Sequence, residues 1–267
     1  MGRGIITLTT DFGLKDPYAG TMKGVILSVN PGAMICDISH QIDPGAIETA
    51  ARMLKETCPF FPPGTVHVAV VDPGVGGARR PILVRTRGHL FVGPDNGIFW
   101  PIISGDSEAQ LIHLTETAYF RPTVSPTFHG RDIFAPVAAH LSLRVDPSEM
   151  GVPIDDPVRL DIKAAQSTED GLTGEITTVD RFGNLITNIG KDVLIDFLSG
   201  HQPLIRSGDR VITALNQKYT DVGPDEVLAL FSSSGYLEIA VNRGRAADRF
   251  GKDAGELRGQ KVAVERQ

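Results

Sequence analysis

Residues 70–80 read VVDPGVGGARR and mark the place where a strand runs into a glycine-rich loop. The β-branched run at 66–71 predicts a buried strand, and the proline and glycines that follow Asp72 cannot continue it. Asp72 should therefore lie at the carboxyl end of a central strand, where ligands bind in open α/β sheets. Glycine backbone can approach a ligand closely, and Arg79 or Arg80 can fold back over the same place. The alternative is a turn capped by Asp72, with two solvated arginines.

Strand and helix patterns alternate on the amino-terminal side of this stretch. Strands are predicted at 5–10 and 33–38 and helices at 18–29 and 47–58, before the strand at 66–71. In the first helix, apolar side chains recur with the i, i+3, i+4, i+7 spacing of one helical face. Such alternation indicates a parallel sheet with crossover helices.

The carboxyl-terminal half has a different pattern, with short strands separated by turn clusters and little helical periodicity. This pattern is typical of a small antiparallel barrel or sandwich. We predict an α/β domain with a mostly parallel sheet flanked by helices over residues 1–163, a linker over 164–172, and a small antiparallel β-barrel domain over 173–267. The other predicted elements are strands at 81–86, 89–92, 110–114, 173–179, 185–188, 210–215, 227–231, 236–241 and 262–265 and helices at 133–143, 193–198 and 246–250.

The chain has 267 residues, 41% of them hydrophobic, and a net charge of −6, a composition typical of a soluble globular protein. No run of lysine and arginine is long enough to follow a phosphate backbone, so no nucleic-acid partner is expected. Cys36 and Cys58 fit neither a metal-ligand spacing nor a disulfide framework, which favours a reducing compartment. No apolar run approaches the roughly 18 residues of a membrane span, and no signal peptide is recognisable. These features predict a cytoplasmic protein without a membrane partner.

Asp11, Asp72 and Asp180 each end a strand pattern or open a turn. Aspartate favours turns because its side chain bonds to nearby backbone, so each position alone is typical of a structural turn. Asp11 and Asp72, however, both follow predicted parallel strands, and two carboxylates at one sheet edge are costly to bury without partners. We therefore expect a ligand, a metal or an arginine beside them. A carboxylate can accept hydrogen bonds from both hydroxyls of a ribose, but neither a G-x-G-x-x-G turn nor a P-loop is present.

His129 precedes Gly130 and a predicted apolar helix. An unperturbed imidazole titrates at about pH 6.5, so His129 is a candidate for acid–base chemistry. The alternative is a helix-capping or surface histidine. No H-x-x-x-H or C-x-x-C pattern indicates a catalytic metal.

Five motifs occur in order along almost the whole chain: TTDFG at 9–13, VVDPGVG at 70–76, FHGRDIFAPVAAHL at 128–141, DRFGNLITNI at 180–189 and SSGYLEIAVN at 233–242. Together they resemble the S-adenosyl-L-methionine hydroxide adenosyltransferase family. Its members are adenosine-forming S-adenosylmethionine hydrolases related to fluorinating and chlorinating enzymes. The resemblance implies an α/β domain, a linker and a β-barrel domain, as predicted from the residue patterns.

The resemblance also implies a catalytic set of Asp72, Arg79 and His129. The family places its arginine seven residues after the aspartate, which selects Arg79 over Arg80. Halogenating relatives have a tyrosine where this chain has Asp72, and no matching histidine. The fluorinating relatives carry a tryptophan where this chain has Gly45. These departures favour water over halide as the nucleophile.

Substrate contacts are implied as well, in a homotrimer whose site lies between the amino-terminal domain of one subunit and the carboxyl-terminal domain of its neighbour. Asp11 matches the ligand of the ribose hydroxyls. Phe182 and Tyr219 are aromatic residues that can pack against adenine. The remaining implied contacts are Asp16, Asp180 and Ser233 around the methionine end and Asn184, Glu238 and Val241 on the nucleoside side.

The resemblance implies hydrolysis of S-adenosyl-L-methionine at C5′ to adenosine and L-methionine, with no metal and no cofactor, since S-adenosylmethionine is the substrate. Arg79 would stabilise hydroxide, and either Asp72 or His129 would accept the proton of the attacking water. The alternatives are an S-adenosylmethionine-dependent halogenase, a non-catalytic module that binds adenosine or S-adenosylmethionine, and a metal-dependent phosphoesterase that uses the acidic strand ends.

Overall fold

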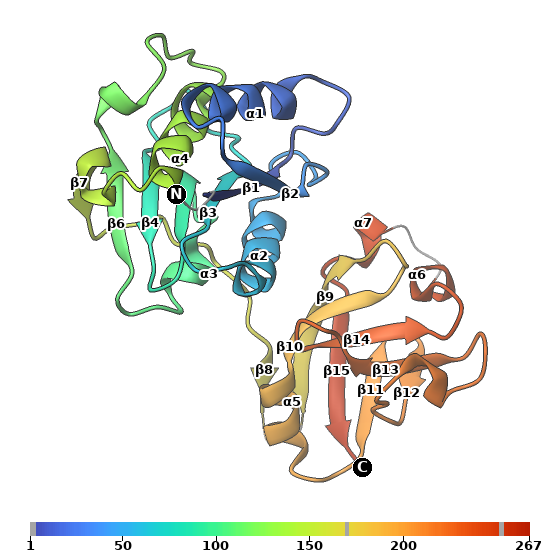
Figure 1. Ribbon diagram of the computed structural model, residues 1–267. Coiled ribbons are helices and arrows are strands. Elements are labelled where there is room, and N and C mark those ends of the chain that lie inside the picture. The colour runs from blue at the N-terminus through green and yellow to red at the C-terminus, as the bar shows by residue number, and fades with distance from the viewer. Residues whose placement is uncertain (1–3, 169–170, 251–253) are drawn as a thin grey trace. The chain divides into compact units, whose positions relative to one another are not determined.

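The computed structural model describes residues 4–168, 171–250 and 254–267 (Figure 1). The chain divides into two compact units, Met1–Asp161 and Ile162–Gln267, each with a hydrophobic core of its own. Across the described residues, no helix combines the length and the apolar character needed to cross a membrane.

The first unit is built on one seven-stranded sheet, whose strands are β1 (Ile5–Thr10), β2 (Met34–Ser39), β3 (Val66–Val70), β4 (Pro81–Arg85), β5 (Leu90–Pro94), β6 (Gln110–Leu114) and β7 (Gly151–Ile154). Their order across the sheet is β2-β1-β3-β5-β4-β6-β7. Pairing is parallel from β2 to β5 and antiparallel from β5 to β7. The sheet is mixed because β4 and β5 are joined by a turn too short for the crossover that parallel neighbours require.

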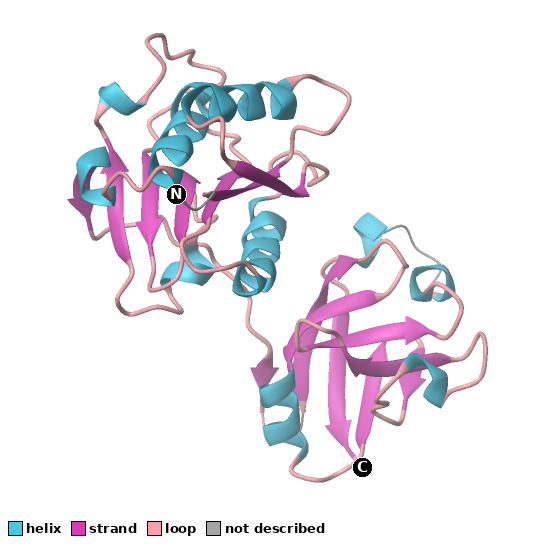
Figure 2. Ribbon diagram, in the orientation of Figure 1, coloured by secondary structure: helices cyan, strands magenta, loops and turns pink. Residues whose placement is uncertain are grey.

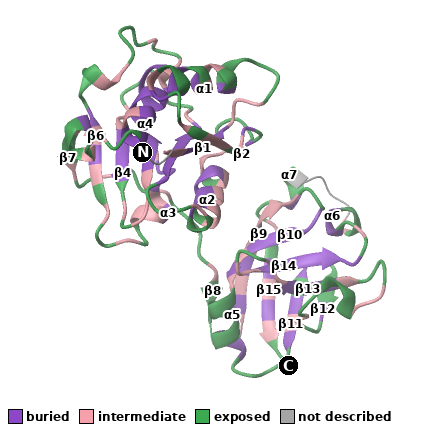
Figure 3. Cartoon of the chain, in the orientation of Figure 1, coloured by how far each residue is buried: buried purple, intermediate pink, exposed green. Residues whose placement is uncertain are grey.

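Helices cover both faces of this sheet (Figure 2), namely α1 (Tyr18–Val29), α2 (Ile47–Thr57), α3 (Trp100–Ile103) and α4 (Ala135–Ser142). α1 and α4 share one core with Val66, Val68 and Val70, whereas α2 and α3 share a second core with Ala69 and Val71. Alternate residues of β3 thus face opposite cores, because side chains alternate along a strand. The strand is buried on both sides, and Figure 3 shows buried residues both in strands of the sheet and in α4, which packs on it. The predicted α/β architecture is confirmed.

One polar side chain, His67, lies within this buried strand and has no exposed surface. Its Nδ1 is 2.8 Å from the Thr7 hydroxyl, and its Nε2 is 3.4 Å from Nδ1 of His89. The His67 ring stacks on Phe91 with centroids 5.0 Å apart. Burial, together with the neighbouring His89, lowers the pKa of His67 to about 3. The side chain is therefore neutral at neutral pH.

The predicted helix at 133–143 begins earlier than expected, with a π-helical turn that continues into α4. This turn, Gly130–Phe134, directly follows His129. π-Helical turns are frequent at functional sites. The short 3-10 turns among the described residues are Cys58–Phe60, Thr117–Tyr119, Pro147–Met150 and Tyr219–Asp221.

The second unit is an antiparallel sheet that curls into a nearly closed barrel, with strands β8 (Gln166–Ser167), β9 (Leu172–Val179), β10 (Leu185–Gly190), β11 (Pro203–Ser207), β12 (Arg210–Ile212), β13 (Val227–Phe231), β14 (Tyr236–Val241) and β15 (Lys261–Arg266). Their order is β12-β11-β15-β9-β10-β14-β13, with β8 beside β9. A bridge between Leu215 and Ala229 brings the segment after β12 against β13. The predicted small antiparallel barrel is confirmed, and β8 lies in the segment predicted as a linker. Its helices are α5 (Lys191–Leu198), α6 (Ala246–Arg249) and α7 (Ala254–Leu257).

Candidate active site

Asp11 and Asp72 follow neighbouring strands at one edge of the first unit's sheet. β1 and β3 pair in parallel up to Thr10 and Val70, so both strands end at the same level. Asp11 Oδ2 accepts a hydrogen bond of 2.9 Å from the backbone N–H of Gly45. The two predicted strand-end carboxylates therefore share one sheet edge, as parallel pairing requires.

Arg79 supplies the cationic partner that Asp72 was expected to have. Its Nε lies 3.0 and 2.9 Å from the two oxygens of the Asp72 carboxylate, and its Nη2 also donates to Oδ2. The side chains of Asp72 and Arg79 are only 5% and 9% exposed. Such a forked, charge-assisted pair is strong and fixes the guanidinium plane.

His129 completes the cluster from a different loop. Its Nδ1 lies 2.7 Å from Nη2 of Arg79. A guanidinium only donates hydrogen bonds, so Nδ1 is the acceptor, and the neutral ring carries its proton on Nε2. Burial lowers the pKa of His129 and the charge of Arg79 lowers it further, against the opposite effects of Asp72 and Asp132. The net shift is downward, so the imidazole is neutral near pH 7.

One donor of this cluster is left over. Arg79 Nη1 is buried and makes no hydrogen bond within the described part of the chain, while the guanidinium lies 5.5 Å from the centroid of the Phe134 ring. Leaving a buried charged donor unpaired is unfavourable. An acceptor oxygen brought to Nη1 by a ligand would satisfy it.

The glycine-rich loop explains how Arg79 returns to Asp72. Successive turns, with Val75 N–H donating to Asp72 O and Gly77 N–H to Gly74 O, reverse the chain. Gly76 has a φ of +76°, and a Cβ there would lie 2.2 Å from the carbonyl oxygen of Pro126. Only glycine therefore fits where this loop packs against the loop that carries His129.

Arg80, the alternative left open by the residue pattern, points to other partners. Its Nε and Nη2 lie 2.9 and 2.6 Å from Oδ2 of Asp95, and its Nη1 lies 2.7 Å from Oδ1 of Asp156. These contacts tie the end of β5 to the segment that leaves the first unit's sheet. Arg80 is therefore structural, and Arg79 is the arginine of the cluster.

Four of the residues expected in the second unit interact with one another through hydrogen bonds or charge, and the other three lie apart. The four are Asp180, Asn184, Tyr219 and Glu238. The Asp180 carboxylate accepts hydrogen bonds of 2.8 and 3.2 Å from the backbone N–H and the side-chain amide of Asn184. Tyr219 donates a 2.8 Å hydrogen bond to Glu238, which is 4% exposed. Burial raises the pKa of Glu238, the nearby Asp180 raises it further, and the bond from Tyr219 opposes both. Burial and the same carboxylates raise the pKa of Tyr219 to about 12.

Asp16, Ser233, Val241 and Phe182 have few polar contacts. Asp16 is exposed just before α1, and Ser233 is exposed in the turn between β13 and β14. Val241 is buried at the end of β14. Phe182 is 73% exposed on the turn after β9, which leaves a large apolar ring free to cover a ligand.

The acidic strand ends are not arranged as a metal site. Among the residues that the structure describes, no three His, Cys, Asp or Glu side chains are grouped as metal ligands would be. The cluster of the first unit instead pairs its carboxylate with a guanidinium.

Two models of one protein family together match most of the chain. Residues 6–151 match the SAM hydroxide adenosyltransferase N-terminal domain, and residues 174–257 match the C-terminal domain of the same family. The chain belongs to the SAM hydroxide adenosyltransferase family. A protein of Salinispora tropica named (R)-S-adenosyl-L-methionine hydrolase is 37% identical, covering 94% of this chain and 95% of its own. A Thermus thermophilus protein of the same name is 37% identical over 92% and 95%.

Two further comparisons bear on the fold and on the reaction of this family member. A crystal structure of an uncharacterised conserved protein from Thermotoga maritima superimposes with a TM-score of 0.90 at 34% identity, covering 98% of this chain and all of the other. A fluorinase from Actinoplanes sp. is 29% identical over 95% of this chain and 96% of its own. The sequence is thus nearer to the hydrolases than to that fluorinase.

Asp132, a buried charged residue beside the site of this SAM hydroxide adenosyltransferase family member, was not predicted from the sequence. Asp132 is fully buried, accepts bonds of 2.7 and 2.8 Å from Arg131, and accepts a 2.9 Å bond from the backbone N–H of Ser125. Its backbone oxygen also accepts from the N–H of Arg121. Burial raises the pKa of Asp132, but these hydrogen bonds outweigh it and the net shift is downward. Asp132 thus ties the loop before His129 to the π-helical turn, and the signal was an acidic residue inside an apolar helix pattern.

Proposed function

We propose that this chain hydrolyses S-adenosyl-L-methionine at C5′ to give adenosine and L-methionine. The observation that carries the proposal is the partly buried Asp72–Arg79–His129 cluster at the carboxyl ends of the parallel strands, with one guanidinium nitrogen left unpaired among the described residues. The relatives from Salinispora tropica and Thermus thermophilus, both named (R)-S-adenosyl-L-methionine hydrolase, support the same reaction.

The chemistry requires an oxygen nucleophile aligned with the C5′–S bond. The new bond joins the water oxygen to C5′, and the electron pair of the broken bond goes to sulfur, which leaves as the neutral thioether of methionine. A positioned nucleophile removes much of the entropic cost of this step. Arg79 stays charged at any working pH, so its free Nη1 can stabilise the developing hydroxide in a site with little water.

The contacts of the cluster divide the remaining roles. Both oxygens of Asp72 accept bonds from Arg79, which makes Asp72 the group that holds the guanidinium in place. His129 is neutral and receives Arg79 at Nδ1. In our proposal Asp72 orients the guanidinium. His129 acts as the general base: a small ring movement frees its Nδ1 from Nη2 of Arg79, and Nδ1 accepts the proton of the attacking water, which leaves the imidazole protonated on both nitrogens.

We extend the proposal to the substrate contacts and the assembly. Asp11 would bind the ribose hydroxyls, and the exposed rings of Phe182 and Tyr219 would pack on adenine. The enzyme would act without metal or cofactor, in the cytoplasm, as a homotrimer with its site between subunits. The remaining contacts would be Asp16, Asp180 and Ser233 at the methionine end and Asn184, Glu238 and Val241 on the nucleoside side.

The deciding experiment is chromatography of purified protein incubated with S-adenosyl-L-methionine. We expect equal amounts of adenosine and methionine, with the same rate after exhaustive chelation. Saturable binding without methionine release would instead indicate a non-catalytic module. Loss of activity on chelation would contradict the metal-independent mechanism.

A halogenase is the second candidate because of the fluorinase relatives. Adding fluoride or chloride to the same reaction separates the two. Hydrolysis predicts no 5′-halogenated nucleoside at any halide concentration. Such a product would overturn the hydrolase assignment.

A further inference from the structure

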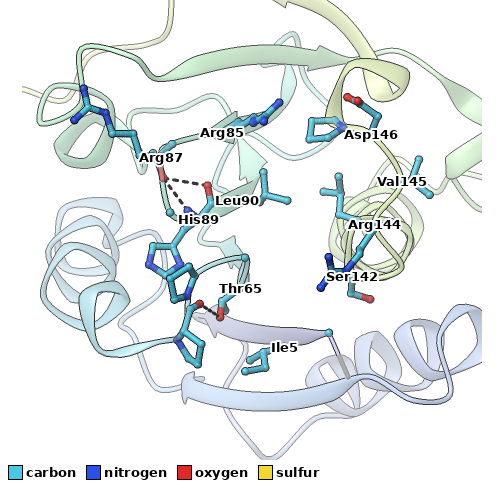
Figure 4. A pocket seen from close by; sticks show the side chains of 18 residues that line it. Ile5, Thr65, Arg85, Arg87, His89, Leu90, Ser142, Arg144, Val145 and Asp146 are labelled. Carbon is cyan, nitrogen blue, oxygen red and sulfur yellow. Dashed lines mark hydrogen bonds between the residues drawn. The ribbon is translucent and has the colours of Figure 1, made fainter. Parts of the chain in front are cut away.

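A cavity of about 690 Å³ lies in the first unit at the opposite edge of the sheet from the Asp72 cluster (Figure 4). It lies at the amino ends of β1 and β3, beside Ile5 and Thr65, whereas the Asp72 cluster follows the carboxyl ends of these strands. The seven residues from Thr65 to Asp72 along an extended chain correspond to roughly 23 Å. The cavity is therefore separate from the proposed active site.

The charge of its lining is opposite to that of the chain. Three arginines and one aspartate line it, a net charge of +2, in a protein whose net charge is −6. His89 also lines it, but burial lowers the pKa of His89, so this ring adds no charge near pH 7. A concave, locally positive site in an acidic protein concentrates anions.

Two of the three guanidiniums are available to a ligand. The guanidiniums of Arg85 and Arg144 make no hydrogen bond or ion pair with the described residues, although the charge of Arg85 helps to lower the pKa of Asp146. Arg87, in contrast, donates a 2.8 Å bond to Glu108. Figure 4 shows Arg144 pointing into the cavity, Arg85 extending over its rim and Arg87 pointing away. The lining acid, Asp146, already accepts bonds of 2.9 and 2.8 Å from Ser148.

Arg144 is also an unusual residue for its backbone position. It follows the C-cap of α4 with a φ of +69°, in the left-handed region. Glycine is the usual residue at this position after a helix, because other side chains are strained there. From this position the Arg144 side chain reaches the cavity (Figure 4).

The rest of the lining is apolar. Ile5, Leu90, Leu141 and Val145 contribute side chains to the walls. The hydroxyl of Thr65 is already bonded to the carbonyl of Pro62. The volume falls in the range of pockets for small organic molecules, which combine apolar walls with a few charged groups.

We propose that this cavity binds a small phosphate monoester with an apolar or aromatic substituent. Two free guanidiniums match a phosphate dianion in charge and in the geometry of their donors. The apolar walls match the substituent. The proposal concerns a site remote from Asp72 and does not depend on the proposed function.

The test is calorimetric titration of the full chain with phenyl phosphate at physiological ionic strength. We expect one saturable site, with R85Q and R144Q each weakening binding by about tenfold to a hundredfold, as expected for loss of a charge-assisted contact. R87Q is the matched control, since it removes the same charge from an arginine that points away. Its affinity should stay within about threefold of the unmodified chain.

Titrations with inorganic phosphate and with benzoate separate the contributions of the anion and the ring. Both should bind more weakly than phenyl phosphate. Three outcomes would overturn the proposal: no saturable binding, affinity unchanged in both R85Q and R144Q, or a loss in R87Q equal to theirs. Circular dichroism of each variant ensures that the comparison is between folded proteins.

Discussion

A single guanidinium holds the candidate site together. Arg79 binds Asp72 through Nε and Nη2, binds His129 through Nη2, and keeps Nη1 free of bonds to the described residues. Lysine has the same charge but presents one compact ammonium instead of a planar fork. The site should therefore depend on the shape of the side chain as well as on its charge.

Arg79→Lys is accordingly expected to lower kcat by about 10²–10³, the loss seen when one preorganised donor is removed from an oxyanion-stabilising site. The rate of adenosine formation measures it. The matched control is Arg80→Lys, a neighbouring arginine that binds Asp95 instead. An R79K rate within a few-fold of the unmodified enzyme would rule out the proposed role of the fork.

The pKa of His129 gives a pH prediction. A general base works when it is neutral, and the pKa of His129 lies below its ordinary 6.5. kcat/KM, which reports groups of the free enzyme, should therefore rise from the acid side with its midpoint below pH 6.5, the ordinary pKa of an imidazole.

Asp132→Asn should move this acid limb to lower pH, because the Asp132 charge raises the pKa of His129. Asp146→Asn, at an exposed residue remote from His129, is the control and should leave the limb in place. A purely structural role for Asp132 would lower the rate without moving the limb.

At the scale of elements, sequence patterns located most of the fold. The strands Ile5–Thr10, Gln110–Leu114 and Tyr236–Val241 and the helix Tyr18–Val29 have the predicted bounds. β7 was missed because Pro153 interrupts its pattern, which an edge strand tolerates since one side of its backbone needs no partner. Strands β4, β5 and β6 were predicted, but the antiparallel direction of their pairing was not, because direction depends on which strands meet in space.

Part of the candidate site was also predictable from the sequence, and part was not. Asp72 and either of two arginines were predictable, because a loop closing on its own strand end is a local event. The contact of Arg79 with His129 joins residues 50 positions apart and depends on how two loops pack. Residue patterns alone cannot give that contact; the family resemblance named both residues. Neither the residue patterns nor the family resemblance predicted Asp132, because its burial depends on partners from the same folded loop.

The packing of those two loops leads to a prediction for Gly76→Ala. The new Cβ would have to displace the Pro126 carbonyl, and with it the loop carrying His129. We expect at least a tenfold loss of activity together with about 1–2 kcal/mol of destabilisation from the left-handed backbone. Thermal unfolding and adenosine formation measure the two effects.

Gly200→Ala is the matched control, because Gly200 has a φ of +89° and an added Cβ would meet no described atom within 4 Å. It should lose comparable stability and keep its activity. Equal activity loss in both variants would show that the backbone strain, and not the displaced loop, is responsible.

At the scale of the whole molecule, the proposed trimer predicts complementation between inactive variants. Three chains of 28.7 kDa give about 86 kDa, which sedimentation velocity measures directly. If Asp72 and Asp180 of one site come from different subunits, coexpressing Asp72→Asn with Asp180→Asn should restore about one quarter of the normal sites, half of one kind times half of the other. A site contained within one chain predicts no restoration.

The buried imidazole of β3 links folding of the first unit to proton uptake. His67 stays neutral in the folded state down to about pH 3, whereas in the unfolded chain it takes up a proton near pH 6.5. Between these values the unfolded state binds more protons, so the free energy of unfolding falls as the pH falls, by about 1.4 kcal/mol per pH unit from this residue. Urea unfolding at pH 7 and pH 4.5 should show a smaller pH dependence in His67→Gln than in the unmodified chain. An identical dependence in both would exclude His67 as its source. In acid, the first unit is thus destabilised through a residue of its central strand, because only the unfolded chain binds the proton at His67.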